Sequence, residues 1–168
     1  MKVLGNPERC LSRTTAFPVV LISTKTNILT VAMIHYFSFR PPTIGIGIHK
    51  SRYSFELIRG ERAFSVNIPT AQQIEAVQIC GSKSGREVDK FQVARLTKVA
   101  ASKISSSLIA ECPVNIECQV VRELPLEERT WFIGEVVAVH EEQGYTSADA
   151  LIYSGSYYRR IGEVIGRR

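Results

Sequence analysis

The chain has 168 residues, of which 45% are hydrophobic and 22% are charged. These proportions are those of a globular domain and exclude a disordered chain. No apolar run approaches the roughly 18 residues of a membrane-spanning helix, and the N-terminal MKVLGNPERC lacks the apolar segment of a signal peptide. We therefore expect a single cytoplasmic domain over residues 1–168 that has no contact with a membrane.

The chain is basic, with a net charge of +5 and a pI near 9.2. This charge favours an anionic partner. Nucleic acid, an acidic protein and a phosphorylated small molecule all meet that description, and the charge does not choose among them. The cysteines at 10, 80, 112 and 118 are too scattered to form a CxxC pair, so we interpret them as reduced and mostly structural. The three histidines have no suitably spaced partner, which predicts no metal site.

The first half of the chain predicts a β-hairpin and a further strand. The run at 18–24 is β-branched, residues 25–27 are turn formers, and 28–39 is again rich in β-branched and aromatic residues. Pro41 and Pro42 end this second strand. The next run, 43–48, alternates Ile with Gly, so one face is nearly bare backbone. Either a flat group approaches that face or the glycines mark a bulge or close strand packing.

A short helix is predicted at 51–59, with Ser51 as its N-cap and Gly60 as its left-handed end. The exposed N–H groups at such a helix start form an anion site. The alternative interpretation is a capped helix with a surface arginine at Arg52.

The second half predicts more strands and one more helix. Thr70 and Gln73 form a capping box before an apolar stripe that ends at Gly81. The polar loop that follows, GSKSGREVDKF, is either a nest of N–H groups around an anion or a solvated turn. Residues 91–107 predict little regular structure. Strands are predicted at 62–68, 113–121, 130–140 and 150–154, with 113–121 and 130–140 antiparallel neighbours.

Many short strands with only two helices predict a mainly β protein, a β-barrel with a few peripheral helices. The segments PVVLIST, NILTVAMIHYFSF, PPTIGIGIHKSRYS, CGSKSGREVDKF, LIAECPVNIECQVV, WFIGEVVAVH and YYR follow one another in this order. This order resembles the flavin reductase-like family of FMN-binding split β-barrels over about residues 15–160. The chain is more similar to the flavoredoxin-like branch, because Glu127, Glu128 and Arg129 precede Trp131 in place of a GDH signature.

The resemblance implies a Greek-key split barrel that forms a homodimer and binds FMN near the subunit interface. It places Asn27, Thr30, Ala32 and Met33 along the isoalloxazine ring, and Gly47, Ile48 and His49 on its other side. It places Ser51, Arg52 and Ser54 at the phosphate, with Lys90 beside it. Ser82 and Ser84 stay open as phosphate contacts. The resemblance identifies no catalytic residue and requires no metal.

Two histidines outside that set have alternative interpretations. His35, in an apolar strand, is better explained as a core or interface residue than as a ligand. His140, at a strand end, is either a nicotinamide contact or a surface residue, and a surface position is favoured. Tyr157, Tyr158 and the two arginines that follow either cover a dimer groove or pack the terminus.

Two functions compete. The first is an FMN-dependent oxidoreductase that takes a hydride from NAD(P)H and passes electrons to a free flavin, ferric iron or a redox protein. The second is an FMN-binding electron-transfer protein without its own NAD(P)H site, because the GDH signature is missing. A nucleic-acid-binding barrel is not expected, since no strand interleaves exposed aromatic residues with Lys and Arg.

Overall fold

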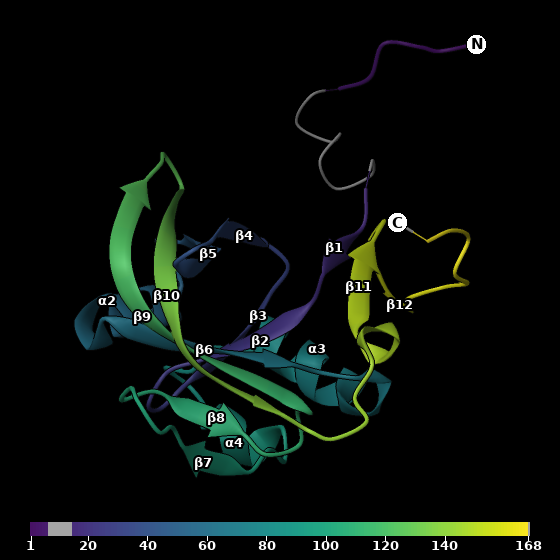
Figure 1. Ribbon diagram of the computed structural model, residues 1–168. Helices are drawn as coiled ribbons and strands as arrows, with labels where there is room; N and C mark the ends of the chain where they lie inside the picture. The colour runs from purple at the N-terminus through teal and green to yellow at the C-terminus, as the bar shows by residue number, and fades with distance from the viewer. Residues whose placement is uncertain (7–14, 168) are drawn as a thin grey trace.

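The computed structural model describes residues 1–6 and 15–167 and shows a mainly β chain with peripheral helices (Figure 1). The predicted split barrel is confirmed by a seven-stranded antiparallel sheet in the order β3-β2-β6-β9-β10-β5-β4. Its strands are β2 (Val20–Ser23), β3 (Ile28–Val31), β4 (Ile34–Phe39), β5 (Pro42–His49), β6 (Ala63–Ile68), β9 (Val114–Pro125) and β10 (Arg129–Glu141). The β2–β3 hairpin and the antiparallel β9–β10 pair are both confirmed.

The sheet rolls into a barrel because of one short connection. The sequence predicted a single strand at 28–39, but the structure breaks it at Ala32 and Met33 into β3 and β4. These two strands lie at opposite edges of the seven-stranded sheet. Two connecting residues can join opposite edges only if the sheet curls until those edges approach each other. The Gly47 N–H donates to the Met33 carbonyl at 2.8 Å and ties this connection to β5.

A three-stranded sheet and the helices lie around the barrel. The small sheet has the order β1-β11-β12, formed by β1 (Phe17–Pro18), β11 (Leu151–Ser154) and β12 (Tyr157–Arg160). The helices are α2 (Tyr53–Glu61), α3 (Ile74–Ser82) and α4 (Lys90–Val93), with short turns η1 (Ala71–Gln73) and η2 (Ser147–Asp149). Figure 1 shows the small sheet beside α3 and the β9–β10 hairpin projecting from the barrel.

Two buried clusters form the core. One fills the barrel and includes Ile22, Ile46, Phe64 and Phe132. The other packs Val77 and its neighbours on α3 against the first strands and the small sheet. The second cluster therefore fixes α3 between the barrel and the small sheet, which is the arrangement that shapes the candidate site.

The structure corrects both predicted ends of the first helix. Arg52 is the N-cap of α2, with no side-chain capping bond, and Ser51 lies in the turn before it. Ser51 does not cap because its hydroxyl is 2.8 Å from His49 Nδ1, a competing partner two residues earlier. Gly60 lies inside the helix, and the left-handed residue is Arg62, with φ of 55°. By contrast, the Thr70–Gln73 capping box is confirmed.

The prediction of a mixed loop with little regular structure at 91–107 holds for 94–97 and 101–106 but missed the short elements that flank them. Helix α4 extends to Val93, and β7 (Lys98–Ala100) pairs with β8 (Ser107–Ile109) in a two-stranded sheet. These elements are too short to produce a recognisable periodicity in the sequence. Residues of β7 are also exposed, so no apolar alternation distinguishes it from a loop.

The described cysteines are buried free thiols, as predicted. Burial raises the pKa of the Cys80 thiol to about 11 and that of the Cys118 thiol to about 12, so both are protonated and inert. Cys10 lies outside the described residues. Within residues 1–6 and 15–167, no helix has the length and apolarity needed to cross a membrane.

Candidate functional site

A cavity of about 350 Å³, here called the anion cavity, opens where the end of β5, the start of α2, the end of α3 and the start of β10 meet. It brings together three of the predicted residues from the HKSR segment, His49, Ser51 and Arg52, with Lys90 from α4. It adds residues that the resemblance left open or did not include, namely Ser82, Lys83, Ser84 and Arg129. Segments far apart in the sequence therefore converge on one basic, hydroxyl-rich cavity.

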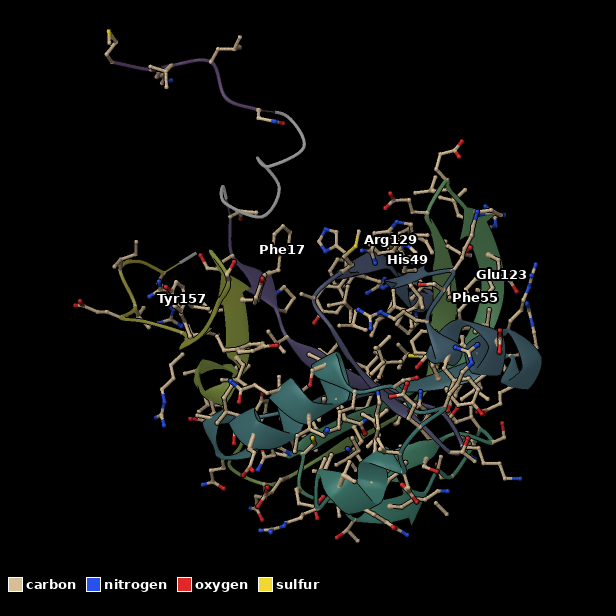
Figure 2. The ribbon with its side chains drawn as sticks, turned by 180° about the vertical axis from the view of Figure 1, so that it is seen from behind. Phe17, His49, Phe55, Glu123, Arg129 and Tyr157 are labelled. Atoms are coloured by element: carbon tan, nitrogen blue, oxygen red, sulfur yellow. The ribbon has the colours of Figure 1, made fainter. Side chains whose placement is uncertain are left out.

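One edge of the anion cavity is formed by a fixed histidine. The Ser51 backbone N–H donates to His49 Nδ1 at 3.1 Å, so this nitrogen accepts and the neutral ring carries its proton on Nε2. His49 is also the register partner of Arg129 across the β5–β10 pair. Figure 2 shows the two labelled side chains next to each other, at the end of β5 and at the start of β10 just after the turn of the β9–β10 hairpin. The strand register, which the sequence alone does not reveal, brings Arg129 to this cavity.

The inner edge is formed by a buried lysine. Lys90 Nζ donates to the carbonyls of Ile28 at 2.9 Å and Cys80 at 2.8 Å. It therefore joins β3 to the last turn of α3, where helix carbonyls lack helical partners. Burial lowers the pKa of this ammonium below its ordinary value, the Cys80 thiol opposes the shift, and the nearby Arg52 guanidinium adds to it.

The anion cavity carries positive charge that the described carboxylates do not neutralise. Among the described residues, no carboxylate lies within ion-pair distance of Arg52, Lys83 or Arg129, whereas Arg86 pairs with Glu56 at 2.9 Å and Arg59 with Glu123 at 3.2 Å. Guanidinium, ammonium and hydroxyl donors around one space are the groups that bind phosphate. The donor set therefore fits a phosphate group such as that of FMN.

A second cavity, of about 520 Å³ and here called the tyrosine cavity, adjoins the first, because Ser82 lines both. It contains two more of the predicted residues, Thr30 and Ala32, and its other lining residues are Val19, Gln78, Gly81, Tyr153 and Tyr158. The Thr30 hydroxyl donates to the Val77 carbonyl at 2.6 Å, so its proton is already bonded within the protein. Small side chains together with two aromatic rings suit a flat ring system.

Asn27 and Ser54 do not line either cavity. Both are buried, and Asn27 Nδ2 donates to the Ser54 hydroxyl at 2.8 Å. Asn27 Oδ1 is buried and has no hydrogen-bond partner among the described residues. The pair links the turn before β3 to the first turn of α2, directly behind Arg52. A contact of either residue with a cofactor stays a prediction.

Met33, Gly47 and Ile48 also lie outside the two cavities. Ile48 points into the barrel core and is 1% exposed. A Cβ built on Gly47 would come within 3.3 Å of the Trp131 ring, and one on Gly45 would overlap the Phe37 ring. The flat groups that approach the bare face of β5 are therefore the chain's own aromatic rings, whose centroids lie 5.6 Å apart. Cofactor contacts of Met33, Gly47 and Ile48 stay predictions.

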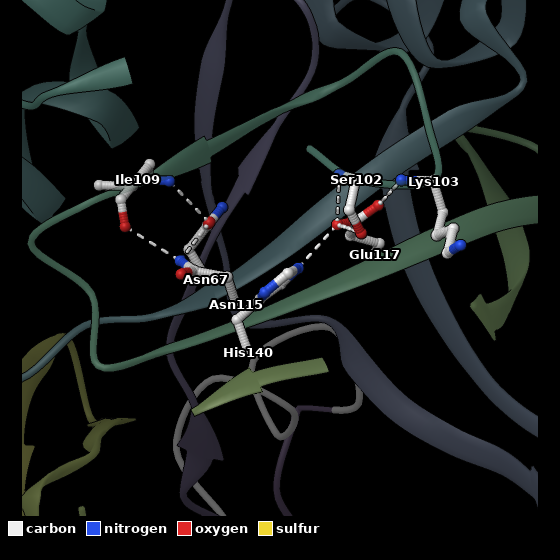
Figure 3. A network of polar contacts seen from close by, with 7 residues as sticks. All are labelled: Asn67, Ser102, Lys103, Ile109, Asn115, Glu117 and His140. Carbon is white, nitrogen blue, oxygen red and sulfur yellow. Dashed lines mark hydrogen bonds and ion pairs between the residues drawn. The ribbon is translucent and has the colours of Figure 1, made fainter. Parts of the chain in front are cut away.

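A separate polar cluster surrounds Glu117, whose side chain is fully buried (Figure 3). Its carboxylate accepts hydrogen bonds from the Ser102 N–H and hydroxyl, the Lys103 N–H and His140 Nε2, at 2.7–2.9 Å. Burial raises the pKa of this carboxyl, but these hydrogen bonds outweigh burial and lower the pKa from 4.5 to about 2. The cluster anchors the segment between β7 and β8, so His140 has a structural partner there.

The sequence did not identify Arg129 or Tyr153 as site residues. Lys83 lies in the loop that the sequence predicted as either an anion nest or a solvated turn, and Tyr158 was expected either to cover a dimer groove or to pack the terminus. In the sequence, Arg129 was noted only as one of the residues before Trp131 that replace a GDH signature. A register assignment of β10 against β5 would have placed it opposite His49. The sequence did not place Tyr153 and Tyr158 at one cavity, because the small sheet brings them there from the end of the chain.

Comparisons with known proteins agree with this fold. A curated but uncharacterised protein of Archaeoglobus fulgidus is 35% identical over 115 residues, which cover 68% of this chain and 65% of that relative. The chain therefore spans a little under two thirds of that relative's length. Flavoredoxin from Methanosarcina acetivorans superposes with a TM-score of 0.90 at 26% identity, over 99% of this chain and 95% of that one. An FMN-binding protein from Thermus thermophilus has a TM-score of 0.87 at 22% identity, covering 100% and 99%.

The family comparison is decisive for the classification. A model described as the flavin reductase like domain matches residues 11–162, which include every residue of the two cavities. The likeness to flavoredoxin supports the same assignment. The chain belongs to the flavin reductase-like family.

Proposed function

We propose that the chain binds FMN, with the phosphate in the anion cavity and the isoalloxazine ring in the tyrosine cavity. The observation that carries this proposal is the shared wall at Ser82, which makes the basic cavity and the flat-walled cavity neighbours. A ligand that joins a phosphate to a flat ring system by a short chain matches that arrangement. Membership of the flavin reductase-like family supports the same ligand.

Specific residues would hold each part of FMN. Arg52 and Arg129 would contact the phosphate through their guanidinium groups, and Ser51, Ser82 and Ser84 through their hydroxyls. Lys90 would add its charge from behind while it keeps its two carbonyl partners. Thr30 and Ala32 would lie along the ring.

The activity that we propose is an oxidoreductase reaction, in which NAD(P)H is the electron donor and a free flavin, ferric iron or a redox protein is the acceptor. Bound flavin supplies the hydride-accepting N5 atom, and the protein supplies binding, orientation and exclusion of water. The test is anaerobic addition of NADH or NADPH to the flavin-loaded protein. Bleaching of the visible flavin absorption supports the oxidoreductase, and an unchanged spectrum with both nucleotides counts against it.

A second candidate is an electron-transfer protein that holds FMN but has no nicotinamide site. The observation that favours it is the turn of the β9–β10 hairpin, where Glu127 and Glu128 precede Arg129 and no histidine is present. The nearby His49 already accepts from Ser51, and His140 is held by Glu117. Bleaching by a reduced redox protein, together with no bleaching by NADH or NADPH, would select this function.

We also propose that the active form is a homodimer, joined through β4. This strand is an edge of the large sheet, and its aromatic residues are exposed, with Tyr36 at 64% and Phe39 at 81%. An open apolar edge strand is a pairing surface, and a two-fold axis lets the same strand meet itself antiparallel. Since β4 follows directly from Ala32 and Met33, a partner there would lie close to the tyrosine cavity.

A further inference from the structure

The small sheet presents one row of aromatic side chains. In its antiparallel register Tyr153 on β11 lies opposite Phe17 on β1 and opposite Tyr158 on β12. Residues directly opposite each other in antiparallel strands project from the same face of a sheet. Tyr157, the next residue along β12, must therefore project from the other face. Figure 2 shows Phe17 on the side toward the barrel and Tyr157 on the side away from it.

Two residues of this row form part of the lining of the tyrosine cavity. Tyr153 and Tyr158 both line that cavity, and their ring centroids lie 5.7 Å apart at an angle of 59°. Both residues also pack against the buried cluster that contains α3. The rings are thus held by a cross-strand contact and by the core, so they form a fixed surface.

The rest of the described lining of the tyrosine cavity is not aromatic, and its longest side chains are Val19 and Gln78. Thr30, Ala32 and Gly81 also line it, and the Thr30 hydroxyl is already bonded to the Val77 carbonyl. A flat ring entering this space would meet small groups as well as the phenol rings. Tilted aromatic contacts of this kind are favourable for a planar π system.

We propose that Tyr153 and Tyr158 contact the isoalloxazine ring of bound flavin and position it. The inference rests on the proposed function and deepens it, because it concerns the ring half of the same site. Burial, and secondarily the neighbouring Tyr153, raises the pKa of Tyr158, so this phenol is neutral at physiological pH. A neutral phenol keeps a hydroxyl donor and an electron-rich ring at the cavity.

The phenol rings give the contact an optical signature. A tyrosine in contact with a photoexcited flavin transfers one electron to it and then takes that electron back, so fluorescence is lost with no net reaction. Phenylalanine does not donate the electron, because it lacks the hydroxyl that makes the ring oxidisable. The Tyr→Phe change otherwise preserves shape and packing.

The test uses time-resolved fluorescence of bound FMN in the wild type, in Y153F, in Y158F and in the double variant. The control is Y157F, whose residue is 66% exposed on the far face of the same strand. The expected result is that the fastest decay component weakens in each single variant and is lost in the double variant, with a several-fold rise in fluorescence. Unchanged decay in the double variant, or an equal change in Y157F, would overturn the inference.

A binding measurement separates this inference from the proposed function. Y158A should weaken FMN and riboflavin by the same factor, roughly 3- to 10-fold, because the contact is to the ring and not to the phosphate. If the wild type binds neither flavin, the proposed function fails. If it binds both and the Phe variants leave the decay unchanged, only the tyrosine contact fails. The Phe variants keep the test valid should Y158A not fold.

Discussion

Gly85 lies against Asn27 so closely that a Cβ built on Gly85 would come within 2.6 Å of Asn27 Cγ. Asn27 cannot move away freely, because the residue is only 2% exposed and its amide is bonded to Ser54. The polar loop between α3 and α4 is therefore packed onto the turn that leads into β3. A glycine is needed at position 85 because Asn27 leaves no room for a side chain there. The sequence pattern had suggested only an anion nest or a solvated turn for this loop.

The first prediction concerns this contact. Gly85→Ala should lower the free energy of unfolding by about 1–3 kcal/mol, because the added methyl group has no space beside the fixed amide. Gly60→Ala is the matched control, since Gly60 lies inside α2 and a Cβ there meets nothing within 4 Å. That control should be neutral or stabilising by up to about 1 kcal/mol. Urea denaturation measures both, and equal effects would contradict the packing explanation.

The second prediction tests the anion cavity. Arg52→Ala should weaken FMN on the order of 10- to 100-fold, because a charge-assisted hydrogen bond to phosphate is lost. Riboflavin has no phosphate and should lose little affinity. Arg59→Ala removes the same charge from the other end of α2, where Arg59 pairs with Glu123, and should affect neither ligand. Equal loss of FMN and riboflavin in Arg52→Ala would count against the phosphate contact.

The sequence predicted those features of the fold and the site whose pattern lies within a few neighbouring residues. The alternation of Val114, Ile116, Cys118 and Val120 predicted a half-buried strand, and the Thr70–Gln73 box predicted a helix start, because each signal lies within a few residues. The order of such segments then predicted the family. The prediction of Ser51 as the N-cap was wrong because His49, two residues earlier, competes for the Ser51 hydroxyl.

Convergence of distant segments could not be predicted in the same way. Arg129 reaches the anion cavity through the register of β10 on β5, and Lys83 through the end of α3. Tyr153 and Tyr158 reach their cavity through a sheet that joins residue 17 to residues 151–160. Register and sheet partners are tertiary properties, and no local pattern encodes them.

The third prediction concerns acid stability. The pKa of Glu117 is lowered from 4.5 to about 2, so its ionised form favours the folded state above pH 4.5. That contribution, roughly 3 kcal/mol, should disappear as the pH falls from 4.5 toward 2. Glu117→Gln removes the titrating group, so the stability gap between wild type and variant should be largest at neutral pH and shrink in acid. Denaturation across this pH range measures the gap, and a gap independent of pH would refute the assignment.

The fourth prediction concerns the proposed dimer. Phe39→Glu places a charge on the exposed β4 edge and should shift the protein to a monomer in sedimentation experiments, because a buried unpaired charge is costly. Ile165→Glu is the control, since Ile165 is 97% exposed in the C-terminal segment and lies outside every strand. A wild type that is monomeric at all concentrations, or a Phe39→Glu variant that still dimerises, would contradict the β4 interface.

The central claim is that the adjoining cavities hold one FMN molecule. Titration of the flavin-free protein with FMN, followed by its visible spectrum and by calorimetry, tests this most directly. We expect stoichiometric binding with a perturbed flavin spectrum, weaker binding of riboflavin, and loss of that difference in Arg52→Ala. A colourless protein that takes up no FMN during the titration would contradict the account.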